Sequence, residues 1–588
     1  MSNRTKDRLR LAKSGIRRIA VWGTCLAVVV FLLSGSLAFG QSAKLSKDLQ
    51  QLSAKQSTDV IVQYFNTPAA SDDVAAASVG AIHGRNLGWF KGHHFKMSLQ
   101  QAARLTTLNS NVKYISLDRP LQAAMNNAVT AVGADIAYQL GYDGTGIGVA
   151  VIDSGVTKVA DLKQSSGFGS RVVYSQNFDS SASTTSDLYG HGTHVAGIIA
   201  GNGASSACPT CDVKFRGIAP NASIINLRAL DVNGAATDSE VIAAINQAIA
   251  LKSQYNIRVI NLSLGRGIYE SYTLDPLCQA VEQAWKAGIV VVVAAGNYGR
   301  DNSNNNYGYL TVTAPGNDPY VITVGAMNTE GTPQRGDDRM ATYSSKGPTM
   351  LDHVVKPDIV APGNLIVSDL ASTTGTLFNL YPSSHVPLSY YTTSTSSQSS
   401  SLYLQLSGTS MATPMVSGAA ALLLQQNPAL TPDQVKARLM LTAYKSFPQY
   451  SSATDPSTGI TYYDLYDIFT VGAGYLDVNA ALSSTALAPA TSGSALSPTA
   501  VYDSTTGTVY LVNGSSVVWG TSVVWGTSVV WGTSVVWGTN AAGQSVVWGT
   551  SSVPNSNPSA FSVVWGTSVV WGTSTDSDAM AVAIGGDQ

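Results

Sequence analysis

The chain has 588 residues, a formal net charge of −2 and only 12% charged side chains, and no basic block follows its N-terminal segment. This charge balance argues against nucleic-acid binding, which needs a clustered positive patch, and the length is ample for one large core with accessory segments. A composition rich in Ser, Thr, Ala and Gly is more typical of an exported protein than of a cytosolic one.

The first 40 residues have the pattern of a secretory signal peptide. Seven Lys or Arg residues between positions 4 and 18 precede an apolar run at 19–33, and small residues at 38 and 40 precede a cleavage point before Gln41. The apolar run is short for a membrane span, and an uncleaved anchor is the alternative. We expect a protein that is secreted or held at the cell surface.

Residues 44–120 have the pattern of a small α+β module. Alternating apolar residues predict strands at 59–65 and 112–117, and helical spacing of apolar residues predicts a helix at 98–108. Nothing in these residues decides between a removable segment and an ordinary domain that stays attached.

From 121 to 484 the pattern alternates between buried strands and helices. The strands are expected at 147–153, 223–230, 256–264, 289–295 and 321–326, and the helices at 237–252, at 275–287 and after a capping box at Thr431. Such alternation predicts an α/β fold, a doubly wound, mostly parallel sheet with helices on both faces. Polar residues at strand ends, such as Asp153 and Asn297, should gather at the carboxyl edge of that sheet.

Three short stretches carry the chemistry. Residues 149–155 (VAVIDSG) end a strand on Asp153, residues 190–197 (GHGTHVAG) place His191 at the start of a small-residue helix, and residues 407–414 (SGTSMATP) place Ser410 before an apolar helical run. A lone serine in such a turn is usually a helix cap. Asp, then His, then Ser is the chain order of a known catalytic triad. Together the three stretches closely resemble the subtilisin-like serine proteases.

The resemblance implies a role for each of these residues. Ser410 would be the nucleophile, His191 its general base and Asp153 the group that orients the imidazole. His194, one helical turn after His191, would be structural. Asn297, in the stretch 294–297 (AAGN), matches the oxyanion asparagine of the family and would act with the backbone N–H of Ser410. Taken alone, Asn297 is an ordinary strand-end turn residue.

The resemblance also implies how substrate binds. A peptide would add as a strand, between one wall at 263–265 and another at 230–236, above a floor at 294–296. The residues assigned to substrate binding are Ser263, Leu264, Gly265, Ala295 and Gly296. Because Asp231 is the only acid in these stretches, a preference for apolar or aromatic side chains over basic ones is expected.

By the same resemblance, residues 44–120 correspond to an inhibitory propeptide that aids folding and is cleaved between about 121 and 129. The peptidase domain then covers 121–484, with a closing segment at 472–480. The partners implied are protein or peptide substrates and the chain's own propeptide as inhibitor.

No cofactor is expected for catalysis, and no metal ligands are assigned. Asp161 matches a calcium-ligand position of the family, but the loop that would complete that site is replaced by residues 202–216. One acid does not supply the six or more oxygens that calcium needs, so a structural calcium ion lacks support. In an exported chain, Cys208 and Cys211 in that loop predict a disulfide bond, and Cys278 a buried thiol.

Two further segments have unusual composition. Residues 370–405 form a long insertion rich in Ser, Thr and Tyr, which is expected either as a rim or lid beside the cleft or as a solvated surface loop. After a linker at 485–514, Ser-Val-Val-Trp-Gly-Thr repeats occupy 515–573, and a disordered end is expected at 574–588.

The repeats are uncharged and suited to strands that pair with other strands. They are expected to dock on the protease unit, on a sister tail or on an envelope surface, and a disordered low-complexity tail is the alternative.

Three functions fit this organisation. The first is a secreted, self-processing serine endopeptidase. The second is a catalytically idle scaffold with the same fold, and the third is a cell-surface adhesion protein that acts through its repeat tail. The complete set of Asp153, His191, Asn297 and Ser410 favours the first.

Overall fold

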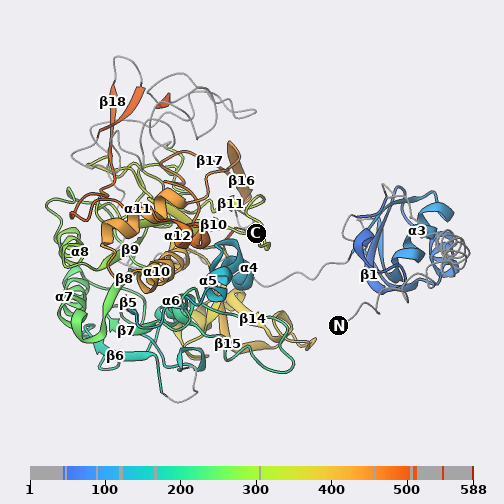
Figure 1. The fold of residues 1–588 in the computed structure, drawn as a ribbon, viewed down its shortest axis with the longest axis horizontal. Helices are drawn as coiled ribbons and strands as arrows, with labels where there is room; N and C mark the ends of the chain where they lie inside the picture. The colour runs from blue at the N-terminus through green and yellow to red at the C-terminus, as the bar shows by residue number, and fades with distance from the viewer. Residues whose placement is uncertain are drawn as a thin grey trace, which may run out of the picture. The chain divides into compact units, whose positions relative to one another are not determined.

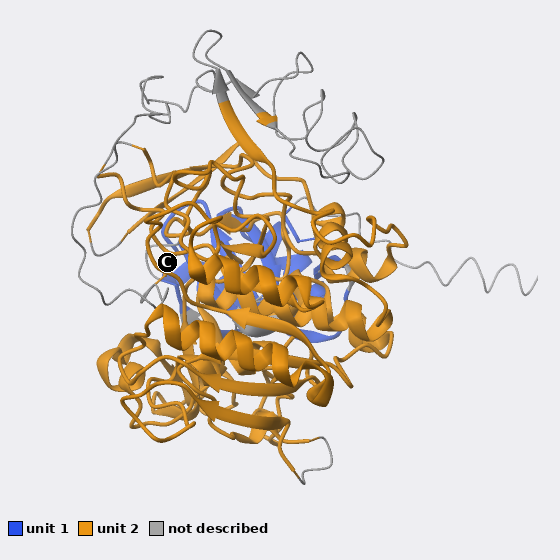
Figure 2. Cartoon of the chain, turned by 90° about the vertical axis from the view of Figure 1, so that its left-hand side faces the viewer, with its two compact units in different colours: residues 1–120 blue, residues 121–588 orange. Residues whose placement is uncertain are grey.

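The computed structural model describes residues 44–46, 49–87, 91–117, 124–164, 169–303, 306–455, 458–503, 508–512, 546–547 and 586–587. The chain divides into two compact units, residues 1–120 and 121–588 (Figure 2). This division coincides with the boundary expected between the N-terminal module and the larger α/β region. The expected signal peptide and almost all of the repeats lie outside the described residues.

Unit 1 is a small α+β module. Its four antiparallel strands lie in the order β2-β3-β1-β4. The elements are β1 (Ser57–Tyr64), α2 (Ala70–Ser78), β2 (Ile82–Asn86), β3 (Gly92–Ser98), α3 (Leu99–Leu108) and β4 (Val112–Leu117), after a short 3₁₀ turn at Leu49–Gln51. The apolar faces of the strands and of α3 bury a separate core that includes Val60, Phe95, Met97, Leu105 and Ile115. The two strands and the helix predicted from the sequence are all present.

Unit 2 is built on an eight-stranded sheet. The strand order is β11-β10-β9-β8-β5-β7-β6, and β12 also pairs with β10. Every pairing is parallel except that of β10 with β11. The strands are β5 (Gly148–Asp153), β6 (Val172–Asn177), β7 (Ser223–Arg228), β8 (Ile257–Leu262), β9 (Val290–Ala294), β10 (Ile322–Asn328), β11 (Arg339–Met340) and β12 (Ile359–Pro362). The predicted mostly parallel sheet is confirmed.

Two pairs of helices enclose the sheet. Helices α6 (His191–Ala200) and α10 (Thr409–Gln426) pack on each other, and α7 (Asp238–Tyr255) and α8 (Pro276–Lys286) form the second pair, with strands between the pairs (Figure 1). Because both faces are covered, central strands such as β5 and β9 are buried at every residue. The remaining described α-helices are α4 (Ala124–Ala131), α5 (Ala134–Gln139), α9 (Thr376–Leu380), α11 (Pro432–Thr442) and α12 (Val478–Ser483), with 3₁₀ turns at Ala160–Leu162, Pro382–Ser384 and Leu388–Tyr390. None of the helices in the described ranges is both long and apolar enough to cross a membrane.

The topology brings three chain segments to one edge of the sheet. After β5 the chain adds β6 and β7 on one side, and β8 to β10 then extend the sheet on the other, so the winding reverses at β5. Strands β9, β8 and β5 are direct neighbours, and their carboxyl ends lead into Asn297, Ser263 and Asp153. Ligands bind at such a reversal in open α/β sheets.

The insertion at 370–405 has its own structure. Strand β15 (Ser399–Leu406) pairs with β13 (Ile366–Asp369) and with β14 (His385–Pro387). Two tyrosines of the insertion, Tyr391 and Tyr403, are buried, and both rings contact Phe215 edge-on. The insertion is therefore structured, and Tyr391 and Tyr403 pack into the core while much of the rest of the segment is exposed.

The segment expected as a linker packs against unit 2. The N–H of Ala495 donates to Asp433, the N–H of Val355 donates to the carbonyl of Pro498, and Ser497 donates to the buried Asp358. These contacts use backbone groups and small polar side chains, so they leave no apolar periodicity in the sequence. The packed unit thus continues past residue 484.

Short antiparallel strands follow at the edge of unit 2. They are β16 (Tyr450–Thr454) with β17 (Thr461–Leu465), and β18 (Thr499–Asp503) with β19 (Thr508–Val512). Strand β20 (Val546–Val547), which comes from the repeat region, pairs with β19.

Candidate active site

A buried carboxylate–imidazole pair lies at the carboxyl end of β5. Asp153 is the last residue of β5 and His191 is the first residue of α6, and their Oδ1 and Nδ1 atoms are 2.8 Å apart. Neither side chain is exposed. When Nδ1 donates to the carboxylate, the lone pair of the imidazole lies on Nε2. Among the described residues, Nε2 has no hydrogen-bond partner, so it is available as a base.

A second buried acid, Asp187, supports this pair. Its carboxylate accepts the N–H groups of Gly190 at 2.7 Å and Thr193 at 2.8 Å, and the hydroxyl of Ser154 at 2.9 Å. Because the N-cap residue of α6 is Gly190, which has no side chain, Asp187 takes over its capping role. The N–H of Ser154 donates to Asp153. Burial raises the pKa of the Asp187 carboxyl.

Asp187 is not among the site residues expected from the sequence. Its position three residues before Gly190, the first glycine of the histidine stretch, could have indicated that it caps the helix. The second glycine of that stretch, Gly192, is also required, because a Cβ there would lie 2.2 Å from the carbonyl oxygen of Gly155.

The serine is held by a reciprocal pair of hydrogen bonds. Ser410 lies in the first turn of α10, and Pro414, four residues later, has no N–H to donate to its carbonyl. The hydroxyl of Ser263 supplies that donor at 2.8 Å, and the hydroxyl of Ser410 donates to the carbonyl of Ser263 at 3.0 Å. Asn261 donates to the Ser263 hydroxyl at 3.0 Å. Ser263, expected as a wall of the substrate cleft, thus fixes the serine to the end of β8.

The structure joins Asp153 to His191 directly, but it joins Ser410 to them only through packing. The Ser410 hydroxyl bonds to Ser263, and His191 contributes no hydrogen bond to it among the described contacts. Helix α6 begins at His191 and Ser410 is the second residue of α10, and these two helices pack on each other. Catalytic hydrogen bonds of this kind often form only when substrate is bound.

Asn297 faces the start of α10. Its Oδ1 accepts the N–H of Thr409 at 2.9 Å and the Thr409 hydroxyl at 3.0 Å. Because both donors approach Oδ1, the orientation of the amide is fixed, and its Nδ2 is directed elsewhere. That nitrogen is buried and has no acceptor among the described residues. A buried donor without a partner is costly, and it suits an oxygen that arrives with substrate.

Thr409 also accepts the N–H of Gly296 at 3.2 Å. It therefore joins the segment after β9 to the segment that carries Ser410. Thr409 could not be identified from the sequence, because a threonine before a helix has many uses and only the fold shows its partners.

The other residues assigned to substrate binding lie at the ends of β8 and β9. Leu264 and Ala295 are buried. A Cβ at Gly265 would lie 2.4 Å from Thr313 Oγ1, and one at Gly296 would lie 2.8 Å from Ser345 Oγ. Close packing of the chain on itself therefore explains both glycines, and their contact with substrate stays a prediction.

The insertion lies beside the histidine segment. The N–H groups of Thr376 and Leu377 donate to the carbonyls of Leu188 and Tyr189, which directly precede Gly190 and His191. The Thr376 hydroxyl donates to the carbonyl of Val232, in the expected second wall. These contacts fit the expected rim.

His194 is structural, as predicted. Its Nε2 bonds to the carbonyls of Ile366 and Leu404, each at 3.1 Å. Burial, together with the nearby His191, lowers the pKa of His194 to about 3, so the ring is neutral at neutral pH.

Asp161 is engaged by protein groups. Its carboxylate accepts the N–H of Ser205 at 2.5 Å and the hydroxyl of Tyr403 at 2.9 Å. Burial, together with Asp161, raises the pKa of the neighbouring Asp369 well above its usual range. The expectation about calcium stays a prediction.

The cysteines behave as predicted. Cys208 and Cys211 form a disulfide bond. Cys278 is a buried thiol whose Sγ donates to Asn317 at 3.2 Å, and burial raises its pKa.

A histidine paired to a buried carboxylate, a serine at a helix start and a buried amide donor beside it define the site of a serine hydrolase. The model of the Subtilase family matches residues 144–464. Serine protease AprX of Bacillus subtilis strain 168 is 38% identical over 341 residues, which cover 56% of this chain and 69% of that protein. Subtilisin DY of Bacillus licheniformis is 33% identical over 316 residues, or 54% of this chain and 90% of that protein.

A solved structure described as a cold adapted subtilisin-like serine proteinase is 29% identical, with a TM-score of 0.37 over 55% of this chain and 89% of that chain. From the family model and the two relatives, the chain belongs to the subtilase family and is a serine endopeptidase.

Because the Ser263 hydroxyl donates to the Ser410 carbonyl, Ser263→Ala should weaken the protein, and the size of the effect should depend on whether residue 414 is proline. Ser263→Ala leaves that carbonyl without a donor, so the free energy of unfolding should fall by about 1–3 kcal/mol. If the activation free energy rises by a similar amount because the Ser410 hydroxyl is held less well, kcat should fall about tenfold, since 1.4 kcal/mol is a factor of ten. KM should change little. Peptide hydrolysis and urea unfolding measure these effects.

Pro414→Ala is the matched background. It restores an N–H that can donate to Ser410 within the helix, so Ser263→Ala should cost much less in that background. An equal loss in both backgrounds would contradict the assignment.

Proposed function

We propose that this protein is a secreted serine endopeptidase that cleaves peptide bonds through an acyl-enzyme on Ser410. The observation that carries the proposal is the 2.8 Å bond between fully buried Asp153 and His191, which leaves Nε2 free of partners among the described residues. A serine hydroxyl is a weak nucleophile at neutral pH and needs such a base.

The proposed reaction begins when the Ser410 hydroxyl turns from the Ser263 carbonyl toward His191 Nε2. His191 takes the proton as Ser410 Oγ attacks the scissile carbonyl carbon, and Asp153 stabilises the resulting imidazolium. The amide Nδ2 of Asn297 and the N–H of Ser410 donate to the oxyanion. His191 then protonates the leaving amine, and water releases the acyl group by the same steps in reverse. No cofactor takes part.

The substrate is proposed to be an extended segment of protein or peptide. It adds as a strand beside 263–265, with the side chain before the scissile bond above Ala295 and Gly296. An apolar or aromatic side chain is favoured at that position because Asp231 is the only acid in the flanking stretches.

Activation by removal of residues 44–120 is part of the proposal. The separate compactness of unit 1 supports a removable propeptide that acts as the chain's own inhibitor, and the signal-like first 40 residues support secretion.

A tail that docks on unit 2 is a compatible second feature. Strand β20 from the repeat region pairs with β19 through Thr508 and Val509. The adhesion function would use the same repeats, and the idle scaffold is disfavoured by the complete set of catalytic side chains.

Two substitutions test the catalytic roles. Ser410→Ala should reduce hydrolysis to the residual level left by binding and the oxyanion donors. Asn297→Ala should lower kcat by about two to three orders of magnitude with little change in KM, because the amide acts only on the developing negative charge. Steady-state hydrolysis of a peptide substrate measures both.

Ser303→Ala is the control, since Ser303 is an exposed serine near the Asn297 segment, and it should retain full activity. Near-normal hydrolysis by Ser410→Ala would reject the proposal.

Self-processing gives a separate prediction. The wild-type product should begin between residues 121 and 129, whereas Ser410→Ala should accumulate a precursor that begins at Gln41, because it cannot cut itself. N-terminal sequencing and intact mass of the secreted proteins measure this. A mature wild-type protein that still begins at Gln41 would remove the claim of self-processing.

A further inference from the structure

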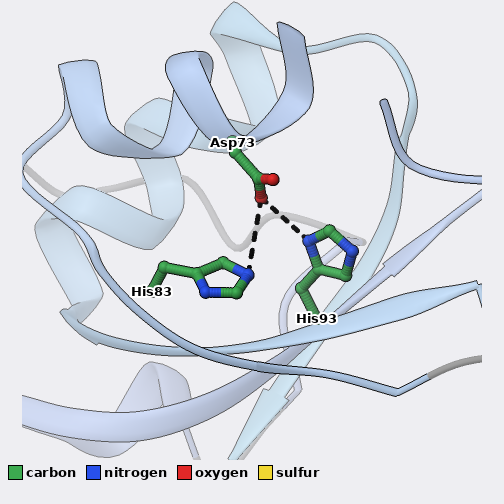
Figure 3. A group of neighbouring side chains, drawn as sticks. All are labelled: Asp73, His83 and His93. Atoms are coloured by element: carbon green, nitrogen blue, oxygen red, sulfur yellow. Dashed lines mark hydrogen bonds and ion pairs between the residues drawn. The ribbon is translucent and has the colours of Figure 1, made fainter. Parts of the chain in front are cut away.

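Unit 1 holds a cluster of metal-ligand side chains. Asp73 on α2, His83 on β2 and His93 on β3 point toward one another (Figure 3). Asp73 Oδ1 lies 2.8 Å from His93 Nδ1 and 3.7 Å from His83 Nε2. One ligand atom from each residue lies within 4.8 Å of the other two. Three elements of the module thus converge on one point.

The donor set matches zinc. Bonds of 2.0–2.1 Å in a tetrahedral site place neighbouring ligand atoms about 3.3 Å apart, and the two distances to Asp73 lie on either side of that value. Asn86 Oδ1, 2.9 Å from His83 Nε2, or a water molecule can fill the fourth position. His93 is buried, and Tyr64 contacts its ring edge-on, so one ligand is already oriented.

A neighbouring pair has one imidazole beside one carboxylate. His94, next to His93 on β3, has its Nε2 atom 3.3 Å from Asp59 Oδ1. In the cluster, by contrast, two imidazoles approach the same oxygen of Asp73. We propose that Asp73, His83 and His93 bind a zinc ion that ties α2, β2 and β3 together.

Zinc that binds only folded unit 1 stabilises it by mass action. At a free concentration of 100 times the dissociation constant, the unfolding equilibrium shifts about 100-fold toward the folded module. Where unit 1 acts as the inhibitor, which rests on the proposed function, zinc would delay its loss and so delay activation.

The test uses the full-length Ser410→Ala chain, in which unit 1 stays attached. Equilibrium dialysis against Zn²⁺ alone should show one ion bound per chain with a dissociation constant below about 10 μM. His83→Ala and Asp73→Asn should abolish binding, while His94→Ala should retain it. Co²⁺ in place of Zn²⁺ should give the visible bands of a four-coordinate site. Because His83 is exposed, His83→Ala should fold as its parent does.

Absence of binding in this chain, or binding unchanged by His83→Ala and Asp73→Asn, would overturn the zinc site. Neither result involves hydrolysis, so failure here is distinct from failure of the proposed function.

A second site lies on unit 2 and is already occupied by the chain itself. Asp587 is buried, with 3% of its surface exposed. Its carboxylate accepts the Arg300 guanidinium at 2.6 Å and both the N–H and the hydroxyl of Thr342 at 2.7 Å. Its backbone N–H and C=O pair with the two ends of the Asn364 side-chain amide, at 2.9 and 2.8 Å.

The residue before Asp587 is equally constrained. Gly586 has φ of +52°. A Cβ there would lie 2.3 Å from Asn364 Oδ1 and 2.4 Å from Ser407 Oγ. The pocket therefore accepts a glycine followed by an acid, and every polar group of that acid is bonded.

The pocket borders the two catalytic segments. Arg300 follows Asn297 by three residues, and Ser407 precedes Ser410 by three. Asn364, which binds the backbone of Asp587, lies next to the Ser407 segment, because the following residue, Leu365, donates its N–H to the Ser407 hydroxyl at 2.9 Å. We infer that this pocket is a recognition site for a Gly-Asp peptide segment, through which residues 586–587 clamp the segments that carry the nucleophile and the oxyanion donor.

Thermal and urea unfolding of the Ser410→Ala chain test the clamp. Asp587→Ala and Gly586→Ala should each shift the unfolding equilibrium toward the unfolded state by about tenfold or more, because buried charged donors lose their acceptor or their fit. Asp587→Asn should lie between. Asp578→Ala, an acid of the same tail outside the described residues, should change nothing.

A chain that ends at residue 584 provides the binding assay. It should be destabilised as Asp587→Ala is, and a synthetic peptide of residues 585–588 should restore its stability, whereas the same peptide with Asn at position 587 should do so less well. Equal stability of the shortened and full-length chains, or no effect of the peptide, would overturn the site.

Discussion

The hydrogen bond between Asp153 and His191 is the interaction on which the rest of the active site depends. A buried carboxylate needs partners to keep its charge, and this one takes them from the imidazole and from the Ser154 N–H. The bond requires the carboxyl end of β5 to lie beside the first residue of α6. Gly192 allows that approach, and Asp187 holds the first turn of α6 in place. The end of β5, the first turn of α6 and Asp187 together hold Asp153 and His191 within hydrogen-bond distance.

Ser410 is held at the same edge of the sheet by a different set of hydrogen bonds. Pro414 removes one hydrogen bond from α10, and Ser263 at the end of β8 supplies the missing donor. The nucleophile is therefore tied to the strand next to β5 rather than only to its own helix. Thr409, one residue earlier, ties the Asn297 segment to the same turn. The ends of two neighbouring strands, β8 and β9, are in this way joined around Ser410.

The parts of this arrangement that are local in the chain could be predicted from the sequence. Asp153, His191, Ser410 and Asn297 stand in short stretches at strand or helix ends, and the apolar runs of β5 and β9 mark buried strands. The spacing of Asp187 before Gly190 was a local sign of its role. The role of Ser263 depends on Ser410, far along the chain, and no local pattern specifies it. Residues 485–503 read as a linker for the same reason, because backbone and small polar groups hold them in place.

The proposed mechanism depends on Ser410 being the nucleophile that His191 activates. Labelling of the processed enzyme with a fluorophosphonate probe, followed by peptide mass mapping, identifies the reactive serine. One adduct is expected, on Ser410, and His191→Ala should greatly slow its formation because the base is lost. An adduct on another serine, or labelling of Ser410 at an unchanged rate in His191→Ala, would contradict that mechanism.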